Sequence, residues 1–447
     1  MLEQKISNNI EKDEYSYFFT MLTDRFEPLN LRWQQALEKQ FNKPFKPIHV
    51  LAYRHNGYFE EENYIVLNHR LEKLTKSMGR KDIINLIYPE DLNKEFSSSK
   101  YISSLIERLV RKQGKVYVVG FTSVWLNINN PNVIVLGPDS KVAGSFDAKQ
   151  THVETFKALG MKTISTKVFK NFEDLLKGQE TYPFFLSAMY SSGGIESKSI
   201  FTAQDLNAYY SNLRPVNQKE PLLASKFIED ITLAPNTTAV VTGPNKTTMV
   251  SVSDQILRNN QYMGNIYPSK VNDHQRKLIE DMTLKVGDFL SSKGYRGLFG
   301  MDFLITASGE CYPVDLNPRR QGGYFCVVMA SKKVNLIELE LSLALGLPIK
   351  DFHYSDFQCD YSWAHSKLSP YFSNVKIKNE VAKGDPVGPF RDIGSTFEAI
   401  YYPKDHTLIM GNPGFYLTTG RSYDEIKSKL HQETEKLISI NYELYEG

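Results

Sequence analysis

The stretch from Gly297 to Gly323, GLFGMDFLITASGECYPVDLNPRRQGG, constrains the fold of this chain more than any other. Apolar residues recur on both sides of Ala307-Ser308-Gly309, which predicts two strands joined by a tight turn. On the second strand, Asp315 and Asn317 stand two positions apart, so their side chains share one face. Asp302, on the first strand, can lie opposite them across the hairpin. The sequence therefore predicts two carboxylates and an amide on one face of a β-hairpin.

Such a set of side chains offers hard oxygen ligands. Mg²⁺ prefers these ligands, and water and phosphate oxygens complete its coordination shell. Arg319 and Arg320 follow directly, and their guanidinium groups can hold anionic oxygens in bidentate fashion. A plainer alternative is a turn device, because Asp and Asn at a strand end often bond to their own backbone. The hairpin thus predicts a metal–nucleotide site. The alternative is that the Asp and Asn side chains only stabilise a turn through hydrogen bonds to their own backbone.

The motif G-x-x-G-M-D-F, a glycine turn and then Y-P-V-D-L-N-P-R closely resembles the metal-binding signature of the ATP-grasp superfamily. Members of that superfamily place an acid where Asp302 stands, an acid (more often Glu) where Asp315 stands, and Asn where Asn317 stands. The resemblance implies that these three residues bind metal, with Asp315 a shorter ligand than the usual Glu. It also implies ATP and Mg²⁺ as cofactors, with two Mg²⁺ ions expected and Mn²⁺ as an alternative metal, and it implies a catalytic role for Arg319.

Length and composition exclude several other classes of protein. The 447 residues are enough for about two or three domains. With 53 basic against 51 acidic side chains, neither a nucleic acid nor an anionic membrane is expected as a partner. Three scattered cysteines are too few for a disulfide framework, and no apolar run approaches the roughly 18 residues that span a bilayer. The acidic, polar N-terminus does not resemble a signal peptide, so we expect a soluble, cytoplasmic protein.

Residues 1–143 are predicted to form an α/β domain. Helical periodicity at residues 32–41 and 102–112 alternates with apolar runs at 47–53 and 115–121, which favours a parallel sheet. No G-x-G-x-x-G follows these strands, so a dinucleotide-binding domain is excluded. In the ATP-grasp resemblance, this region corresponds to a pre-ATP-grasp domain.

The resemblance assigns residues 144–350 to an ATP-grasp domain, in which two α+β subdomains surround a nucleotide cleft and residues 297–323 form the metal hairpin. The segment from Gly144 to Gln150 is predicted to open a helix that contains Lys149 in its first turn. In ATP-grasp proteins a lysine near this place binds phosphate oxygens, although here Ala148 is inserted relative to the common pattern. The alternative is that Lys149 is a solvated surface lysine that does not bind phosphate.

A small lid subdomain is expected at about residues 165–255. A predicted strand at residues 182–188 leads to a Ser/Gly loop, whose glycines permit close approach of the backbone to phosphates. The loop can also be a simple turn. In the superfamily this strand usually ends in a phosphate-binding lysine, and the matching residue here is Ser187. The implied phosphate-binding residues are Ser187, Ser191, Ser192, Gly193 and Gly194.

Residues 221–229 resemble the hinge that reads the adenine edge through backbone groups. The resemblance therefore implies that Lys226, Phe227 and Ile228 contact the base, whereas Ser225 replaces a frequent acid. An ordinary buried strand explains the same apolar content. Arg258 lies in a segment that faces the substrate in the superfamily and is the second catalytic candidate, with a surface arginine as the alternative. Residues 351–447 predict a small α+β module, in which His365 is expected to be structural.

The order of lead-in domain, lid loop, hinge and metal hairpin resembles peptide-ligase-type ATP-grasp enzymes with a pre-ATP-grasp domain, such as the pheganomycin-type ligases. This implies an ADP-forming carboxylate–amine ligase, in which a carboxylate of an amino acid or peptide becomes an acyl phosphate that an amine captures. Small-molecule carboxylates and amines are the expected partners. The sequence leaves open whether the chain forms a homodimer.

Two alternative functions remain. The first is a carboxylate–thiol ligase that loads a carrier protein. The second is a non-catalytic nucleotide-binding relative, which is suggested by Ser187 and Ser225 in place of the usual lysine and acid.

Overall fold

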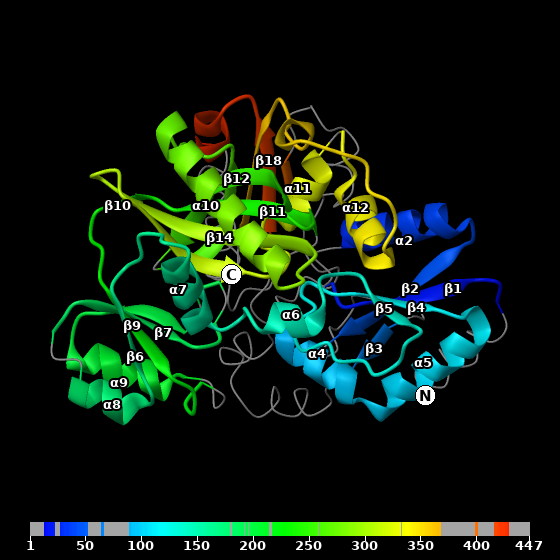
Figure 1. Ribbon diagram of the computed structural model, residues 1–447, viewed down its shortest axis with the longest axis horizontal. Coiled ribbons are helices and arrows are strands. Elements are labelled where there is room, and N and C mark those ends of the chain that lie inside the picture. The colour runs from blue at the N-terminus through cyan, green and yellow to red at the C-terminus, as the bar shows by residue number, and fades with distance from the viewer. Residues whose placement is uncertain are drawn as a thin grey trace, which may run out of the picture.

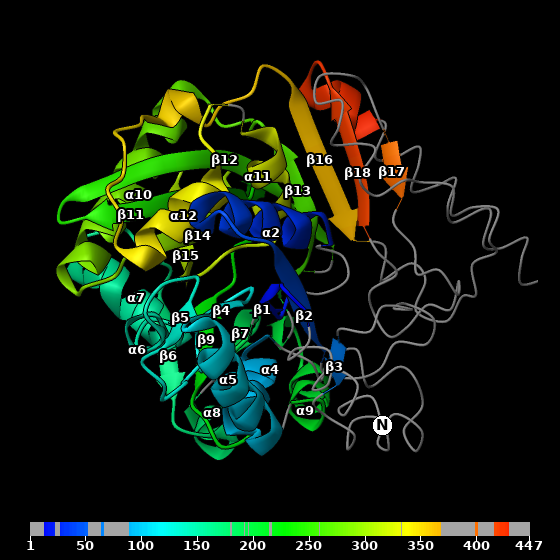
Figure 2. The same cartoon turned by 90° about the vertical axis from the view of Figure 1, so that its right-hand side faces the viewer.

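The structure, a computed structural model, describes residues 13–22, 27–51, 64–66, 89–178, 181–191, 193–194, 196–213, 217–258, 260–331, 333–367, 398–400 and 415–428. Within these residues the strands form three β-sheets flanked by helices (Figures 1 and 2). In Figure 1 the N-terminal sheet lies at the lower right, a small sheet at the lower left, and a large central sheet above both. In the described part of the chain, no helix is long and apolar enough to cross a membrane.

The N-terminal sheet is parallel, as predicted, with strand order β3-β2-β1-β4-β5. Its strands are β1 (Ser16–Thr20), β2 (Phe45–Leu51), β3 (Tyr64–Val66), β4 (Val116–Val119) and β5 (Val133–Val135). Helix α2 (Glu27–Phe41) packs on β2, whereas α4 (Pro89–Ser98) and α5 (Lys100–Gln113) pack together, with α5 against β4. The apolar stripe of α5, at Ile102, Leu105, Ile106 and Leu109, is buried. Its helical spacing is what made this helix predictable.

The small sheet, which we call the lid sheet, is antiparallel with strand order β6-β9-β7-β8. Its strands are β6 (Thr166–Phe169), β7 (Phe184–Ala188), β8 (Ser197–Ile200) and β9 (Leu222–Lys226). Helices α8 (Phe172–Gly178) and α9 (Ala203–Ser211) contribute Leu175 and Leu206 to the apolar cluster on one face. Alternate residues of β7 join that cluster, and the residues between them, Phe185 and Ser187, line a cleft.

The central sheet is antiparallel with the order β10-β14-β11-β12-β13-β16-β18-β17, and β15, which lies off this path, also pairs with β14. Its strands are β10 (Ile231–Leu233), β11 (Pro235–Gly243), β12 (Lys246–Arg258), β13 (Gln261–Tyr267), β14 (Gly297–Thr306), β15 (Cys311–Asn317), β16 (Ser362–Lys367), β17 (Glu398–Ile400) and β18 (Phe415–Gly420). The predicted metal hairpin is β14 and β15. Helix α10 (Asp273–Ser292) covers β11 and β12 with Ile279, Val286 and Leu290.

Two of the predicted boundaries differ from the structure. The lid was expected to reach about residue 255, but the lid sheet ends at Lys226, and residues 235–258 pair within the central sheet. The tail was expected to form a module of its own after residue 350. Its described strands instead extend the central sheet, because β16 pairs with β13. Both differences have one reason: alternation along a strand identifies a strand but does not identify its partner.

Four short helices connect the sheets. They are α6 (Ser140–Gly144), α7 (Lys149–Ala158), α11 (Tyr324–Ala330) and α12 (Leu336–Leu345), and a 3₁₀ turn, η2 (Tyr354–Asp356), precedes β16. Helix α12 contacts both α2 and β14, so it lies between the N-terminal domain and the central sheet.

A buried ion pair joins the N-terminal sheet to the central part of the molecule. Nη2 of Arg320 lies 2.8 Å from Oε1 of Glu340 on α12, and both side chains are almost fully buried. The same guanidinium donates to the carbonyl oxygens of Gly120 and Leu136, which follow β4 and β5. It also stacks over the Trp33 ring of α2, 5.2 Å from its centroid. Arg320 therefore holds four separate segments together.

Replacing Arg320 with Met should destabilise the protein by about 3–5 kcal/mol, because the Glu340 carboxylate would stay buried without its cation. We expect the midpoint of urea unfolding, followed by circular dichroism, to fall accordingly. Lys39→Met is the matched control, since it removes the exposed Lys39–Glu338 ion pair between the same two helices, α2 and α12, and exposed pairs contribute little. Equal midpoints for the two variants would contradict this structural role of Arg320.

Candidate active site

A cleft lies between the lid sheet and the central sheet, and residues of both line it. Helix α7 borders it, and the backbone N–H of Lys149 at the start of α7 donates to the Met189 carbonyl, 3.1 Å away, just after β7. The lid wall includes Ser187, Gly193, Gly194, Ser197, Ser199, Ser225, Lys226, Phe227 and Ile228. The opposite wall includes Lys149, Asn236, Tyr262, Asp302, Asp315, Asn317, Arg319 and Gln321. Most of the residues singled out from the sequence therefore face one cavity.

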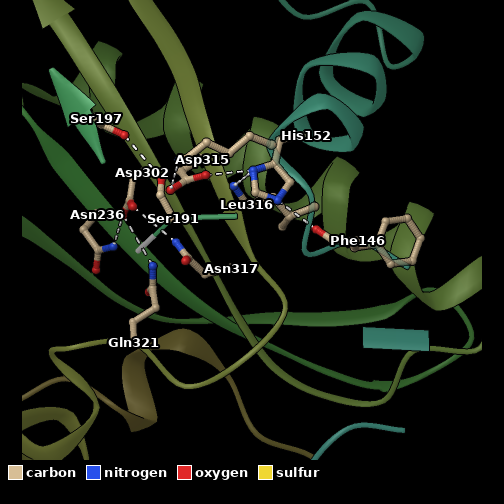
Figure 3. Close-up of polar contacts among 11 residues, drawn as sticks. Phe146, His152, Ser191, Ser197, Asn236, Asp302, Asp315, Leu316, Asn317 and Gln321 are labelled. Atoms are coloured by element: carbon tan, nitrogen blue, oxygen red, sulfur yellow. Dashed lines mark hydrogen bonds and ion pairs between the residues drawn. The ribbon is translucent and has the colours of Figure 1, made fainter. Parts of the chain in front are cut away.

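The register of the hairpin brings the proposed metal-binding residues together. Asp302 of β14 pairs directly with Asp315 of β15, and Gly300 pairs with Asn317. Figure 3 shows the two carboxylates and the Asn317 amide converging from the two strands. This is the arrangement that the two-residue spacing predicted. Their role as metal ligands stays a prediction.

Three side-chain amides surround the Asp302 carboxylate. Nδ2 of Asn236 donates to its Oδ1 at 2.5 Å, Nε2 of Gln321 donates to the same oxygen at 3.4 Å, and Nδ2 of Asn317 donates to Oδ2 at 3.2 Å (Figure 3). Gly300 makes room for Gln321, because a Cβ on Gly300 would lie 1.8 Å from the Gln321 Oε1. No cation is among these hydrogen-bond donors.

The Asp315 carboxylate, by contrast, is held by two side chains of α7. Nζ of Lys149 lies 3.0 Å from Oδ2, and Nδ1 of His152 lies 2.7 Å from Oδ1. Nε2 of the buried His152 is 2.8 Å from the carbonyl oxygen of Phe146. Since a carbonyl oxygen can only accept, Nε2 carries a proton and donates to it. The imidazole is thus fixed at both nitrogens (Figure 3).

The two environments drive the pKa values of the two acids apart. Burial, together with the neighbouring Asp315 charge, raises the pKa of Asp302 to about 6, although hydrogen bonds from the Asn236 and Asn317 amides lower it. Burial also works against the charge of Asp315, but Lys149 and His152 outweigh it and lower the pKa of Asp315. Ionised Asp315 is therefore stabilised by its neighbours, whereas ionisation of Asp302 costs free energy.

The chemistry of these side chains fits Mg²⁺. In the described residues no group of three or more His, Cys, Asp or Glu side chains could hold a metal ion, so a zinc-like centre has no support there. Two carboxylates with neighbouring amide oxygens are a hard-oxygen set, as Mg²⁺ prefers. The Asn317 amide donates its nitrogen to Asp302, which leaves its oxygen for a metal.

The Ser/Gly loop of the lid faces this site. Gly193 and Gly194 have positive φ angles of 63° and 77°, which favour glycine. The Gly193 carbonyl accepts from the Tyr262 N–H of β13 at 3.0 Å, so the loop touches the central sheet. Ser191 Oγ lies 3.3 Å from Ser197 Oγ (Figure 3). Ser192 was also predicted here and lies outside the described residues.

Ser187 lines the cleft rather than the core of the lid. It is 8% exposed and pairs directly with Ser197 of β8, so hydroxyl groups occupy this part of the wall. Among the described residues that line the cleft, the cationic side chains are Lys149, Lys226 and Arg319. The middle of β7 and β8 therefore presents neutral hydrogen-bonding groups toward the two carboxylates.

The predicted hinge follows β9 and forms one end of the cleft. Lys226 ends β9, and Phe227 and Ile228 line the cavity together with apolar side chains that include Ile164 and Leu304. Ser225 Oγ lies 2.9 Å from Thr166 Oγ1, so a hydroxyl pair stands where the superfamily often has an acid. The base-contacting roles stay predictions.

The arginines separate into different roles. Arg319 lines the cleft, and its guanidinium lies 5.6 Å from the Phe121 ring centroid while Nη1 donates to the Arg320 carbonyl at 3.2 Å. Arg320 was expected to hold anionic oxygens beside it, but its guanidinium is buried against Glu340. That expectation was wrong, because the chain turns after β15 and sends the two side chains apart. Arg258 ends β12, and its side chain lies outside the description.

Sequence reasoning missed several residues of this site. His152 stands three residues after Lys149, on the same helix face, which is the signal that could have found it. Asn236 reaches Asp302 through the pairing of β11 with β14, and no local pattern reveals that pairing. Gln321 follows the arginines directly, and its contact depends on the space above Gly300.

Comparison with known proteins agrees with this geometry. Residues 189–323, which contain the lid loop and the metal hairpin, match the family model of the ATP-grasp domain. The chain contains an ATP-grasp domain. Over 100 residues it is 30% identical to L-propargylglycine–L-glutamate ligase of Streptantibioticus cattleyicolor, which covers 22% of this chain and 20% of that protein.

Solved structures share the fold of this chain over nearly its whole length. A biotin carboxylase–β-γ-ATP complex from Campylobacter jejuni has a TM-score of 0.66 at 14% identity and covers 94% of this chain and 90% of that one. An L-amino acid ligase from Bacillus licheniformis has a TM-score of 0.61 at 13% identity, with 95% and 98% covered. At such identities the likeness shows the fold, and the predicted fold class is confirmed.

The curated relatives are longer than the matched region. The chain spans 20%, 25% and 50% of the lengths of the first three that match.

The hydroxyl at Ser187 leads to a prediction about nucleotide affinity. Replacing Ser187 with Lys should tighten ATP binding by about tenfold, because a charge-assisted hydrogen bond is about twice as strong as a neutral one. Isothermal titration with ATP would measure this. Ser211→Lys is the control, since it adds the same charge on the exposed end of α9, outside the cleft. Unchanged affinity in the Ser187 variant would show that this position does not face the phosphates.

The lid loop leads to a prediction about dynamics. A non-hydrolysable ATP analogue with Mg²⁺ should slow amide hydrogen exchange in the peptide that spans residues 189–200, because bound phosphates would fix the loop. Exchange in α9 should stay unchanged and serves as the internal control. Equal exchange of the loop peptide with and without the analogue would argue against a lid at this place.

Proposed function

We propose that this chain is an ATP-dependent, ADP-forming carboxylate–amine ligase. It activates the carboxylate of an amino acid or peptide as an acyl phosphate and joins it to an amine. The observation that carries the proposal is the register pair Asp302–Asp315, which faces a Ser/Gly loop across the cleft of an ATP-grasp domain. The similarity to two amino-acid ligases supports the choice of substrates.

The cleft has distinct parts for the base and for the reaction. Its apolar end, beside Phe227, Ile228 and Leu304, suits a flat base, with backbone groups after β9 at hand. The two carboxylates and Asn317 lie on the central-sheet wall and would hold Mg²⁺, which supplies positive charge to the phosphates. Arg319 and Lys149 add further positive charge on the same wall.

The difficulty of the first step is that two anions must meet. A carboxylate oxygen of the substrate attacks the γ-phosphorus, and the bond from that phosphorus to the bridging oxygen breaks, which releases ADP. Lys149 and Arg319 reduce the repulsion, and the lid loop keeps water from the acyl phosphate. An amine then attacks the acyl carbon and phosphate leaves, so ATP, acid and amine give ADP, phosphate and amide.

This mechanism requires no nucleophile from the protein. In the described part of the chain, neither a cysteine nor a histidine lines the cleft, which agrees with direct attack by the substrate carboxylate. The two-ion prediction and the choice of amine over thiol both belong to this proposal. A thiol acceptor would use the same residues up to the acyl phosphate, so the two acceptor classes must be assayed side by side.

The test is ADP release with ATP, Mg²⁺ and pooled amino acids. The wild type should release ADP, and Asp315→Ala should lower the rate at least about a hundredfold, since it removes a metal ligand and leaves Lys149 and His152 unopposed. Asp281→Ala, on the exposed face of α10, is the control and should keep the wild-type rate. Circular dichroism would show that both variants fold.

Two outcomes would overturn parts of the proposal. Wild-type turnover in Asp315→Ala would mean that the metal is held elsewhere. ATP binding by the wild type without ADP release, for any acid with amine or thiol acceptors, would favour the binding-only alternative suggested by Ser187 and Ser225.

A further inference from the structure

Every carboxylate oxygen of the proposed metal site already has a protein partner. The two oxygens of Asp302 accept from amides, and the two oxygens of Asp315 contact Lys149 and His152. A carboxylate oxygen can accept more than one partner, so a metal ion can share Asp315 with a hydrogen-bond donor, but it competes with a cation held at the same oxygen. The way in which a metal ion binds therefore depends on whether Lys149 or His152 leaves Asp315.

The contacts of His152 oppose its displacement from Asp315. It is buried, and while Nδ1 faces Asp315, Nε2 donates to the Phe146 carbonyl at 2.8 Å. A rotation of the ring that released Asp315 would also break the second hydrogen bond and leave a buried carbonyl without its donor. The bond from His152 therefore fixes Oδ1 of Asp315.

The side chain of Lys149, by contrast, is suited to displacement from Asp315. Its ammonium group ends a flexible four-carbon stem, its side chain is 16% exposed, and it reaches Asp315 Oδ2 from the first residue of α7. Its charge acts on Asp302 as well as on Asp315. The ammonium therefore offsets part of the negative charge of the paired acids from its contact with Asp315, at the place where a metal ion would add positive charge.

We propose that Lys149 is a placeholder cation, which occupies Asp315 Oδ2 until metal and nucleotide arrive together and then moves to a phosphate of the nucleotide. The inference rests on the metal–nucleotide site of the proposed function. A divalent ion at Asp315 repels an ammonium group held about 3 Å from the same carboxylate. Displaced Lys149 needs an anion, and the nucleotide brings one.

A coupling between the two ligands follows. Metal alone must displace Lys149 without any compensating anion, so it binds weakly. Metal with nucleotide displaces the same ammonium group onto a phosphate, so each ligand strengthens the binding of the other by the same factor. A purely structural ion pair between Lys149 and Asp315 would produce no such coupling through this residue.

The experiment measures Mn²⁺ binding by electron paramagnetic resonance of the free ion, with and without ADP. In the wild type, ADP should tighten Mn²⁺ binding by about tenfold or more, in the usual range of coupled sites. In Lys149→Met, Mn²⁺ alone should bind about tenfold more tightly than to the wild type, and the effect of ADP should shrink toward none. Lys149→Arg keeps the charge and should keep weak binding of Mn²⁺ alone.

Lys157→Met is the matched control, because it removes an exposed lysine from the other end of the same helix and should behave as the wild type. Lys149→Gln provides a second neutral variant should Lys149→Met fail to fold by circular dichroism. Mn²⁺ affinity without ADP that is unchanged or weaker in the neutral variant would overturn the placeholder role.

These readouts separate the inference from the proposed reaction. Tighter Mn²⁺ binding in the neutral variant supports the placeholder even when no ADP is released with any substrate, a result that would overturn the ligase proposal alone. Absence of Mn²⁺ binding by the wild type and all variants, with and without ADP, would overturn the placeholder and the metal site together.

Discussion

Two half-buried carboxylates facing each other across β14 and β15 are the constraint on which the site depends. The register places Asp302 beside Asp315, and their charges repel in a poorly hydrated environment. The structure compensates them from different elements. Amides of β11, of β15 and of the segment after it reach Asp302, whereas α7 supplies Lys149 and His152 to Asp315. The first turns of α7 are therefore placed by electrostatics as well as by packing.

The two walls of the cleft carry different kinds of polar side chains. The central-sheet wall carries the acids together with Lys149 and Arg319, whereas the middle of the lid sheet presents hydroxyls such as Ser187 and Ser199. In the proposed function, Lys149 and Arg319 supply positive charge from one wall, Lys226 supplies it from the end of β9, and the middle of the lid sheet contributes hydrogen bonds and exclusion of water. In the proposed function, this division makes a lid with Ser187 at the position of the usual lysine compatible with catalysis, and it gives Lys149 two anionic partners, Asp315 and a phosphate.

Adjacent residues can have unrelated roles when the chain turns between them. Arg319 faces the cleft, whereas Arg320 is buried against Glu340 and links the N-terminal sheet to α12. The same short segment therefore carries a candidate catalytic group and the buried ion pair that joins two parts of the molecule. A change at Arg320 would alter stability first, and any loss of activity would follow from that.

The sequence by itself determined the features that depend on neighbours along the chain. Period-two alternation and the Ala307–Gly309 turn specify the metal hairpin and put Asp315 and Asn317 on one face. Helical spacing of apolar residues specifies α5, and the alternation of predicted strands and helices specifies a parallel N-terminal sheet.

Tertiary structure alone decided the features that depend on distant partners. Asn236 reaches Asp302 across 66 positions, and Lys149 reaches Asp315 across 166. The assignment of residues 235–258 and of the tail strands to the central sheet has the same origin. A strand's own residues specify its alternation, but its partner is set by which edges the folded core leaves available, and no local pattern records that.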